Sequence, residues 1–243
     1  MKIAEGFHGQ KYVGGVLDEN ENESCVINPF ELDCVTMIEQ SLALARVSKN
    51  KNVTKENITE KLIQELTFIR YRNGELKDYL SRLHYSKDWA LDNIKKGIIK
   101  DVGKEIGEEI GEEIYKKYIN FMSAHPQFYN KLKSNPELIN KIKNIEEKIN
   151  SKDIYYIPKD KITQNILAKI KSGDLIFFTT NIEGLDYSHT AIAFRGDDEK
   201  FENNKLGLIH ASTTHKKVVI EESLLDYINS VKKHSGITIL RSL

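Results

Sequence analysis

The sequence predicts an α+β protein with helices in the first half and an antiparallel sheet in the second. From Asp33 to about Asn150, apolar residues recur at helical spacing, whereas from Asp174 onward they form short strand-like runs. Helices followed by strands favour α+β over a parallel βαβ arrangement. No Pro/Gly/Ser-rich linker separates the halves. We therefore expect one domain over residues 1–243, with a helical insertion at about 86–165.

Two helices are predicted near the N-terminus. The first should begin after Asp33, a good N-cap residue, and the second should follow a Thr54 cap. Their apolar stripes are Val35, Ile38, Leu42 and Ala45 in the first, and Ile58, Leu62, Leu66 and Ile69 in the second.

Five strands are predicted in the second half, bounded by polar turns. They span residues 174–180, 188–195, 206–212, 216–222 and 235–243. The polar segment 196–205 fits a hairpin connection between the second and third of them.

Glycine recurs every fourth residue at Gly103, Gly107 and Gly111. This spacing predicts one stripe of a helix. Each glycine inside a helix costs about 1 kcal/mol relative to alanine, so three of them indicate that another element packs unusually close. A partner-binding helix is the alternative to such intramolecular packing.

The charge balance excludes several functional classes. The 36 Lys and Arg residues equal the 36 Asp and Glu residues, which argues against a nucleic-acid binder. With 2 cysteines and no zinc-type spacing, we expect neither a disulfide scaffold nor a metal or other cofactor. No apolar run is long enough to span a membrane, and the first residues lack an export signal. The protein either stays inside the cell or is a processed form.

Cys34 is the candidate nucleophile. It falls in the first turn of the helix that Asp33 should cap, where free N–H groups and the helix dipole lower the pKa of a thiol. The same N–H groups can hold an oxyanion. A small buried side chain is the alternative role for Cys34, and Cys25 is expected to be structural.

His189 and His210 are the candidate base and its orienting partner. They are the two histidines inside predicted strands, placed nearly symmetrically about the loop near residue 200. On one sheet face they would be cross-strand or diagonal neighbours, with Ala191 and Ala193 on that face leaving room for the Cys34 helix. The alternative is two core histidines bonded to carbonyl groups. We expect the remaining strand-free histidines to be exposed: His8, His125, His215 and His234.

The segment 70–85 concentrates arginine and tyrosine side chains. Arginine binds carboxylates bidentately, so this segment is either a cleft for an acidic peptide or an ordinary helix end and loop. Arg82 is our candidate for a substrate carboxylate. The run 12–15, Tyr-Val-Gly-Gly, fits a turn that places a phenol close to another backbone segment.

Several of these motifs together resemble a known family, the N-acetylmuramoyl-L-alanine amidase-like branch of the NlpC-type, papain-like cysteine peptidases. The motifs that carry the resemblance, in order, are Tyr12-Val-Gly-Gly15, Asp33-Cys34, Ala43-Leu-Ala-Arg46, Arg70-Tyr-Arg72, Ser81-Arg-Leu-His-Tyr85, Gly184-Leu-Asp-Tyr-Ser-His-Thr-Ala191 and Leu208-Ile-His-Ala-Ser212. The broader superfamily has Ser-Gly after Asp-Cys, whereas this chain has Val35-Thr36, as in the amidase-like branch.

The resemblance implies a papain-like fold and hydrolysis of a peptidoglycan amide bond. Cys34 would be the nucleophile, His189 the base and His210 the residue that orients it. The residues assigned to substrate binding are Tyr12, Asp33, Arg82, Tyr85 and Ser188.

The expected activity is cysteine-dependent cleavage between N-acetylmuramic acid and L-alanine, in peptidoglycan or muropeptides. Two alternatives remain open: an endopeptidase that cuts the stem peptide after D-glutamate, and a non-catalytic cell-wall binding module. The resemblance implies a location in the cell envelope, periplasmic or secreted, with the cytoplasm as the alternative. Oligomeric state and any need for an anhydro-sugar stay open.

Overall fold

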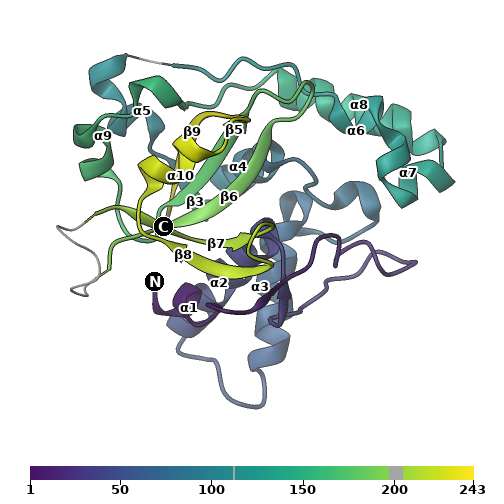
Figure 1. The fold of residues 1–243 in the computed structure, drawn as a ribbon. Coiled ribbons are helices and arrows are strands. Elements are labelled where there is room, and N and C mark those ends of the chain that lie inside the picture. Colours follow the sequence, from purple (N-terminus) through teal and green to yellow (C-terminus); the bar gives the residue numbers. More distant parts are fainter. Residues whose placement is uncertain (112, 197–204) are drawn as a thin grey trace.

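One curled, mostly antiparallel sheet organises the molecule (Figure 1). The computed structural model describes residues 1–111, 113–196 and 205–243. Strand order is β2-β1-β8-β7-β6-β5-β9-β3, with β4 also paired to β9. The strands are β1 (Lys11–Tyr12), β2 (Glu31–Leu32), β3 (Ile99–Asp101), β4 (Ile157–Pro158), β5 (Leu175–Thr180), β6 (Tyr187–Phe194), β7 (Gly207–Ser212), β8 (Lys217–Glu221) and β9 (His234–Ser242).

Helices cover both faces of the sheet and extend beyond one of its ends. They are α1 (Lys2–Glu5), α2 (Cys34–Lys49), α3 (Ile58–Arg70), α4 (Ser86–Lys95), α5 (Gly103–Ile106), α6 (Phe121–Ala124), α7 (Asn130–Ser134), α8 (Glu137–Asn150), α9 (Gln164–Lys169) and α10 (Leu224–Ser230). The mixed α+β class, the five predicted strands and the two predicted N-terminal helices are confirmed, within one or two residues at the strand ends. Most of the hairpin segment 196–205 lies outside the described residues.

Alternation along the strands divides the core into two layers. In β5, Leu175 and Phe177 join the cluster beneath α2 and α4, whereas Ile176 and Phe178 join the cluster beneath α9 and α10. Successive strand side chains point to opposite faces, and both faces of this sheet are covered. An almost uninterrupted apolar strand such as 175–178 is the expected result.

The predicted insertion at 86–165 is not helical throughout. It contributes β3 and β4, which both pair with β9, so part of it belongs to the sheet. The helices α6, α7 and α8 lie together away from the sheet (Figure 1) and enclose a small apolar core of their own. That core includes Tyr85, Met122 and Ile142.

The predicted glycine helix is wrong in extent. Helix α5 ends at Ile106, and Gly111 has φ +80°, a left-handed conformation that ends helical winding. The close packing is nevertheless present: a Cβ on Gly103 would lie 3.1 Å from the Cβ of Tyr155. A side chain at this position would crowd the neighbouring chain segment, although no long helix is present.

The start of α3 also differs from the prediction. Asn57, not Thr54, is the N-cap residue, and its side chain accepts a hydrogen bond from the Thr54 N–H at 2.8 Å. Thr54 thus belongs to the turn that precedes the helix.

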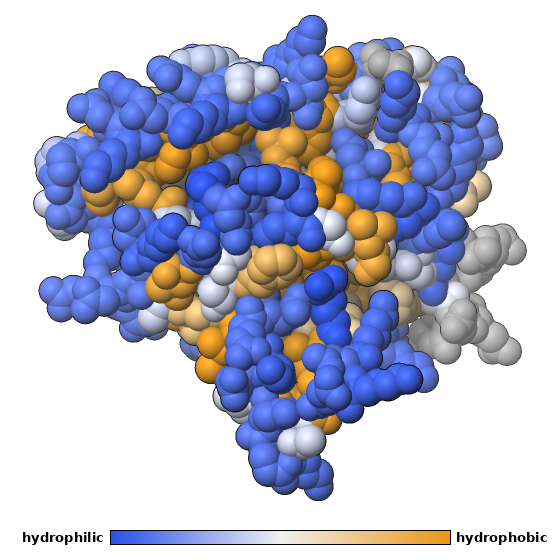
Figure 2. Space-filling model, turned by 180° about the vertical axis from the view of Figure 1, so that it is seen from behind, coloured by the Kyte–Doolittle hydropathy of each residue, from blue (hydrophilic) through white to orange (hydrophobic). Residues whose placement is uncertain are grey.

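The surface opposite the view of Figure 1 is mainly hydrophilic, with apolar side chains visible between the polar ones (Figure 2). Among the described residues, no helix combines the length and apolar character needed to cross a bilayer.

Candidate active site

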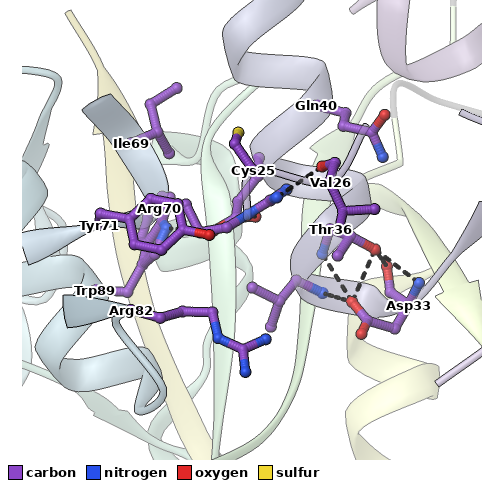
Figure 3. Close-up of polar contacts among 12 residues, drawn as sticks. Cys25, Val26, Asp33, Thr36, Gln40, Ile69, Arg70, Tyr71, Arg82 and Trp89 are labelled. Carbon is purple, nitrogen blue, oxygen red and sulfur yellow. Dashed lines mark hydrogen bonds and ion pairs between the residues drawn. The ribbon is translucent and has the colours of Figure 1, made fainter. Parts of the chain in front are cut away.

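Asp33 starts helix α2 and so places Cys34 at its first position. The Asp33 carboxylate accepts hydrogen bonds from the N–H groups of Val35 and Thr36, at 3.0 and 2.7 Å, and the Thr36 hydroxyl accepts one from the Asp33 N–H at 2.9 Å (Figure 3). This reciprocal capping box fixes where the helix begins. The predicted N-cap is confirmed.

A buried ion pair anchors the same helix. Arg70 on α3 donates to Glu39 on α2 at 2.7 Å, and both side chains are almost inaccessible to solvent. Trp89 of α4 donates to the second Glu39 oxygen at 3.1 Å. Arg70 also reaches the Val26 carbonyl, as Figure 3 shows, at 2.7 Å. Helices α3 and α4 thereby hold the helix that carries Cys34.

His189 and His210 lie on one face of the sheet. Strand register pairs Ile192 with Ile209, which makes the two histidines diagonal neighbours, and His189 Nε2 lies 2.7 Å from His210 Nδ1. The predicted shared face is confirmed. Ala191 and Ala193 share the His189 face, as predicted, but the room they were expected to leave for the Cys34 helix is not used by it: that face packs against α9 and α10, whereas α2 packs on the opposite face.

Thr190 joins the histidine strand to the cysteine helix. Its hydroxyl donates a hydrogen bond of 2.8 Å to the backbone carbonyl of Cys34. Because Thr190 follows His189, this bond holds the start of α2 against β6 beside the histidine.

Two cavities meet at Cys34. The larger, about 760 Å³, and the smaller, about 190 Å³, are both lined by Cys34, Ser188 and His189. Tyr12 lines the larger cavity and Tyr85 the smaller one. A substrate extended on both sides of a reacting bond therefore has space on both sides of Cys34.

The low thiol pKa expected for Cys34 is wrong. Burial and, after it, the Asp33 carboxylate raise the pKa of Cys34 to about 11. The capping carboxylate occupies the N–H groups of Val35 and Thr36 and brings a negative charge next to the sulfur, which opposes the helix dipole. At neutral pH the side chain is therefore a thiol that needs a base.

His189 is in the correct protonation state to act as that base. Burial, followed by the neighbouring His210 and His234, holds its pKa well below the usual range. Burial also lowers the pKa of His210, although Glu221 partly opposes this effect. Both imidazoles are neutral at pH 7, and the resting site is a thiol–imidazole pair.

Alkylation of the unliganded protein should reflect this pairing. We expect the rate of Cys34 labelling by iodoacetamide to rise about tenfold per pH unit from about pH 7 to about pH 10, because the thiolate fraction rises by that factor below the pKa. Peptide mass spectrometry of quenched samples gives the rate for Cys34. A rate that is already constant from about pH 6 upward would instead show a thiolate–imidazolium pair.

His234 was expected to be exposed but is buried, with 3% of its surface accessible. Its ring stacks on Phe178 with centroids 4.6 Å apart, and its ring nitrogens have no hydrogen-bond partner among the described residues. It lines the larger cavity, and burial lowers its pKa to about 4. His234 lies directly before the predicted last strand, 235–243, and the observed strand β9 begins at His234, so this position was a signal for burial. His8 and His215 are exposed as expected, whereas His125 is half-buried.

Tyr12 and Ser188 are at the site, as predicted. Burial, followed by the charges of Cys34 and Asp33, raises the pKa of Tyr12 to about 12, so its phenol stays a hydrogen-bond donor. The Ser188 hydroxyl is buried without a hydrogen-bond partner among the described residues. Tyr12 lines the larger cavity and Ser188 lines both.

The arginines of the 70–85 segment form internal contacts, and only its end, at His84 and Tyr85, lines the smaller cavity. Arg82 is buried and paired with Asp18 and Glu23, and the Tyr85 hydroxyl donates to Glu146 at 2.7 Å. The prediction that Arg82 binds a substrate carboxylate is not supported by its contacts, which are with carboxylates of its own chain. This geometry favours a structural role for Arg82, in holding the loop after Tyr12.

No group of three metal-binding side chains is arranged to hold an ion in residues 1–111, 113–196 and 205–243. Of the three neighbouring histidines, His189 stacks with His234 and forms a hydrogen bond with His210.

Comparison with known protein families assigns the chain to one of them. The family model for AmiA-like, N-acetylmuramoyl-L-alanine amidase-like proteins matches residues 2–237. The chain belongs to this family. No curated protein sequence matches it.

Solved structures agree with the family assignment. An N-acetylmuramoyl-L-alanine amidase from Bacteroides uniformis is 34% identical, with a TM-score of 0.87 over 100% of this chain and 96% of the other. A Bacteroides fragilis protein named as a candidate xylanase is 33% identical, with a TM-score of 0.87 over 99% and 100% of the two chains. A Legionella pneumophila protein is 25% identical, with a TM-score of 0.71 over 100% and 87%. Membership in this amidase-like family indicates a hydrolase that acts on a peptidoglycan-type substrate.

Proposed function

We propose that this amidase-like protein uses Cys34 to hydrolyse the amide bond between N-acetylmuramic acid and L-alanine. The observation that carries the proposal is the placement of Cys34 beside His189 on a shared cavity wall, with His189 bonded to His210 at 2.7 Å. A nucleophile, a base and a residue that orients the base are the groups that cysteine-dependent amide hydrolysis uses.

The first half of the reaction forms a thioester. His189 takes the Cys34 proton as the sulfur attacks the lactyl carbonyl carbon, and the resulting oxyanion is stabilised by hydrogen-bond donors. The Asp33 cap uses the Val35 and Thr36 N–H groups, which leaves the Cys34 N–H and the Tyr12 phenol as donors for the oxyanion. His189 then protonates the leaving L-alanine nitrogen, and the C–N bond breaks.

The second half regenerates the enzyme. His189 removes a proton from water, the hydroxide attacks the thioester, and the C–S bond breaks to give the free lactyl carboxylate and the Cys34 thiol. His210 keeps the His189 ring in place through both halves. Each proton that His189 takes is returned within the same cycle, so no external acid is needed.

The NlpC-type, papain-like placement belongs to the same proposal. It is supported by a nucleophile at the first position of a helix that packs on an antiparallel sheet bearing the base. In this proposal residues 1–243 form one domain, to which 86–165 contributes both helices and strands. The proposed site of action is the cell envelope, where peptidoglycan lies.

Product analysis tests the proposed bond. We expect purified protein to convert muropeptides into free stem peptides that begin with L-Ala-D-Glu and into peptide-free sugars, as measured by mass spectrometry. A parallel set of substrates with and without the anhydro ring defines the sugar requirement.

Other products identify the alternatives. Sugar that keeps L-Ala-D-Glu would show an endopeptidase that cuts within the stem. Binding to muropeptides with no turnover by the wild-type protein would show a cell-wall binding module. The His189→Ala variant is the negative control, since it removes the base and leaves the sheet intact.

A further inference from the structure

We propose that Glu221 is a positioning residue that fixes the tautomer of His210 and, through it, the free ring nitrogen of His189. This inference rests on the proposed function, because it concerns how the base is kept ready for Cys34. It extends the chain of interacting groups by one residue that the sequence motifs do not contain.

The geometry is a continuous row of polar atoms. His189 Nε2 lies 2.7 Å from His210 Nδ1, and His210 Nε2 lies 3.4 Å from a Glu221 carboxylate oxygen. His210 is 1% exposed, so its second nitrogen depends on Glu221 rather than on bulk water. Strands β7 and β8 support the arrangement, because His210 pairs with Val219, two residues before Glu221.

Only one arrangement of protons leaves His189 basic toward the sulfur. When His210 carries its proton on Nε2, its Nδ1 accepts from the His189 Nε2–H, and His189 Nδ1 keeps a free lone pair. In the opposite tautomer, His210 donates from Nδ1 to His189 Nε2, so His189 carries its proton on Nδ1. In this second tautomer, His189 Nδ1 already carries a proton and cannot take the proton of the Cys34 thiol.

A carboxylate at Glu221 selects between these tautomers. Ionised carboxylates only accept hydrogen bonds, so Glu221 stabilises the His210 form that has a proton on Nε2. The opposite form would place the Nε2 lone pair against the carboxylate charge. Glu221 also stabilises the positive charge that the histidine pair carries once Cys34 has given up its proton.

Other groups around Glu221 leave this role intact. His215, from the loop after β7, lies 4.0 Å from the same carboxylate oxygen, farther than His210. The Tyr227 ring of α10 packs at a tilt beside His210 with ring centroids 4.8 Å apart, and burial raises the pKa of Tyr227, so it stays a neutral phenol. His210 is thus the closest of the titratable groups known to face the carboxylate.

The direct test is the tautomer itself, read from the ¹⁵N chemical shifts of His210 in the intact protein at pH 7, with the signals assigned from a His210→Asn spectrum. We expect the Nε2–H tautomer in the wild-type protein and a mixture in Glu221→Ala. A wild-type Nδ1–H tautomer, or an unchanged Nε2–H tautomer in Glu221→Ala, would overturn the proposal.

Kinetics on muropeptides provide the second readout. Loss of a group that orients a catalytic histidine typically costs about 10–100-fold, and we expect that loss in kcat for Glu221→Ala with KM nearly unchanged. Glu221→Gln should lose less, because its amide oxygen can still accept from Nε2–H. The exposed Glu147→Gln on α8 removes the same charge outside the row of hydrogen bonds and outside both cavities, and it should behave as wild type.

The outcomes separate this inference from the proposed function. The NMR result does not depend on turnover, so it stands even if the protein cuts another bond. A Glu221→Ala variant with wild-type kcat would refute the positioning role while leaving Cys34 as the nucleophile. An equal loss in Glu147→Gln would show a general charge effect and would also refute it.

Discussion

Replacing Cys34 with serine should reduce amide hydrolysis by at least about a thousandfold while leaving the melting temperature unchanged. A hydroxyl is a far weaker nucleophile than a thiol at the same position, and the loss of a nucleophile removes the covalent step altogether. The exchange of one sulfur for one oxygen leaves the Asp33 cap and the packing of α2 intact. Turnover of a muropeptide and thermal unfolding, measured on the same preparation, test both statements.

Cys25 provides the matched control. It is a second half-buried free cysteine, whose thiol donates weakly to the Ile63 carbonyl at 3.8 Å, away from the cavities beside Cys34. Cys25→Ser should retain wild-type turnover. Full activity in Cys34→Ser, or an equal loss in both variants, would exclude Cys34 as the nucleophile.

Removing the Arg70 side chain should cost about 3–5 kcal/mol of the free energy of unfolding, because it leaves the Glu39 charge buried and unpaired. Arg70 and Glu39 are each about 1% exposed, and the Glu39 carboxylate has Trp89 as its other partner. Urea denaturation of Arg70→Met at pH 7 measures the loss. The double variant Arg70→Met/Glu39→Gln should recover part of it, since the amide keeps an acceptor for Trp89 without the charge.

An exposed ion pair gives the contrast. Lys11 and Glu31 lie 3.0 Å apart with side chains 68% and 37% exposed, and Lys11→Ala should cost less than about 1 kcal/mol. Equal losses at Lys11 and Arg70 would show that burial does not set the strength of the Arg70 contact. A double variant no more stable than Arg70→Met would show that lost packing, and not the unpaired charge, causes the effect.

Local sequence patterns were sufficient to predict the helix and strands that carry the candidate active site. Asp33 before an apolar helical stripe defines the start of α2, and the apolar runs around His189 and His210 define β6 and β7. These signals lie within a few residues of each other along the chain, so a linear pattern can contain them. The spacing of the two histidines about one loop predicted that they are cross-strand or diagonal neighbours, and the strand register placed them on one face.

Long-range burial could not be predicted in the same way. The segment with Arg70 and Arg82 has the composition of an exposed binding surface, yet its guanidinium groups pair with Glu39, Asp18 and Glu23 from distant parts of the chain. The residues near an arginine in the sequence do not predict which distant carboxylate will pair with it. The same reason explains why His234 was expected to be exposed.

The sequence by itself determined the α+β order, the cap before Cys34 and the pairing of two histidines, because each depends on neighbouring residues or on strand alternation. Only the tertiary structure decided the chemistry of the sulfur. Burial and the Asp33 charge raise the pKa of Cys34, against the effect of the helix dipole, and so make the thiol depend on His189. The environment of a titrating group is assembled from segments far apart in the chain, and its desolvation exists only once they pack together.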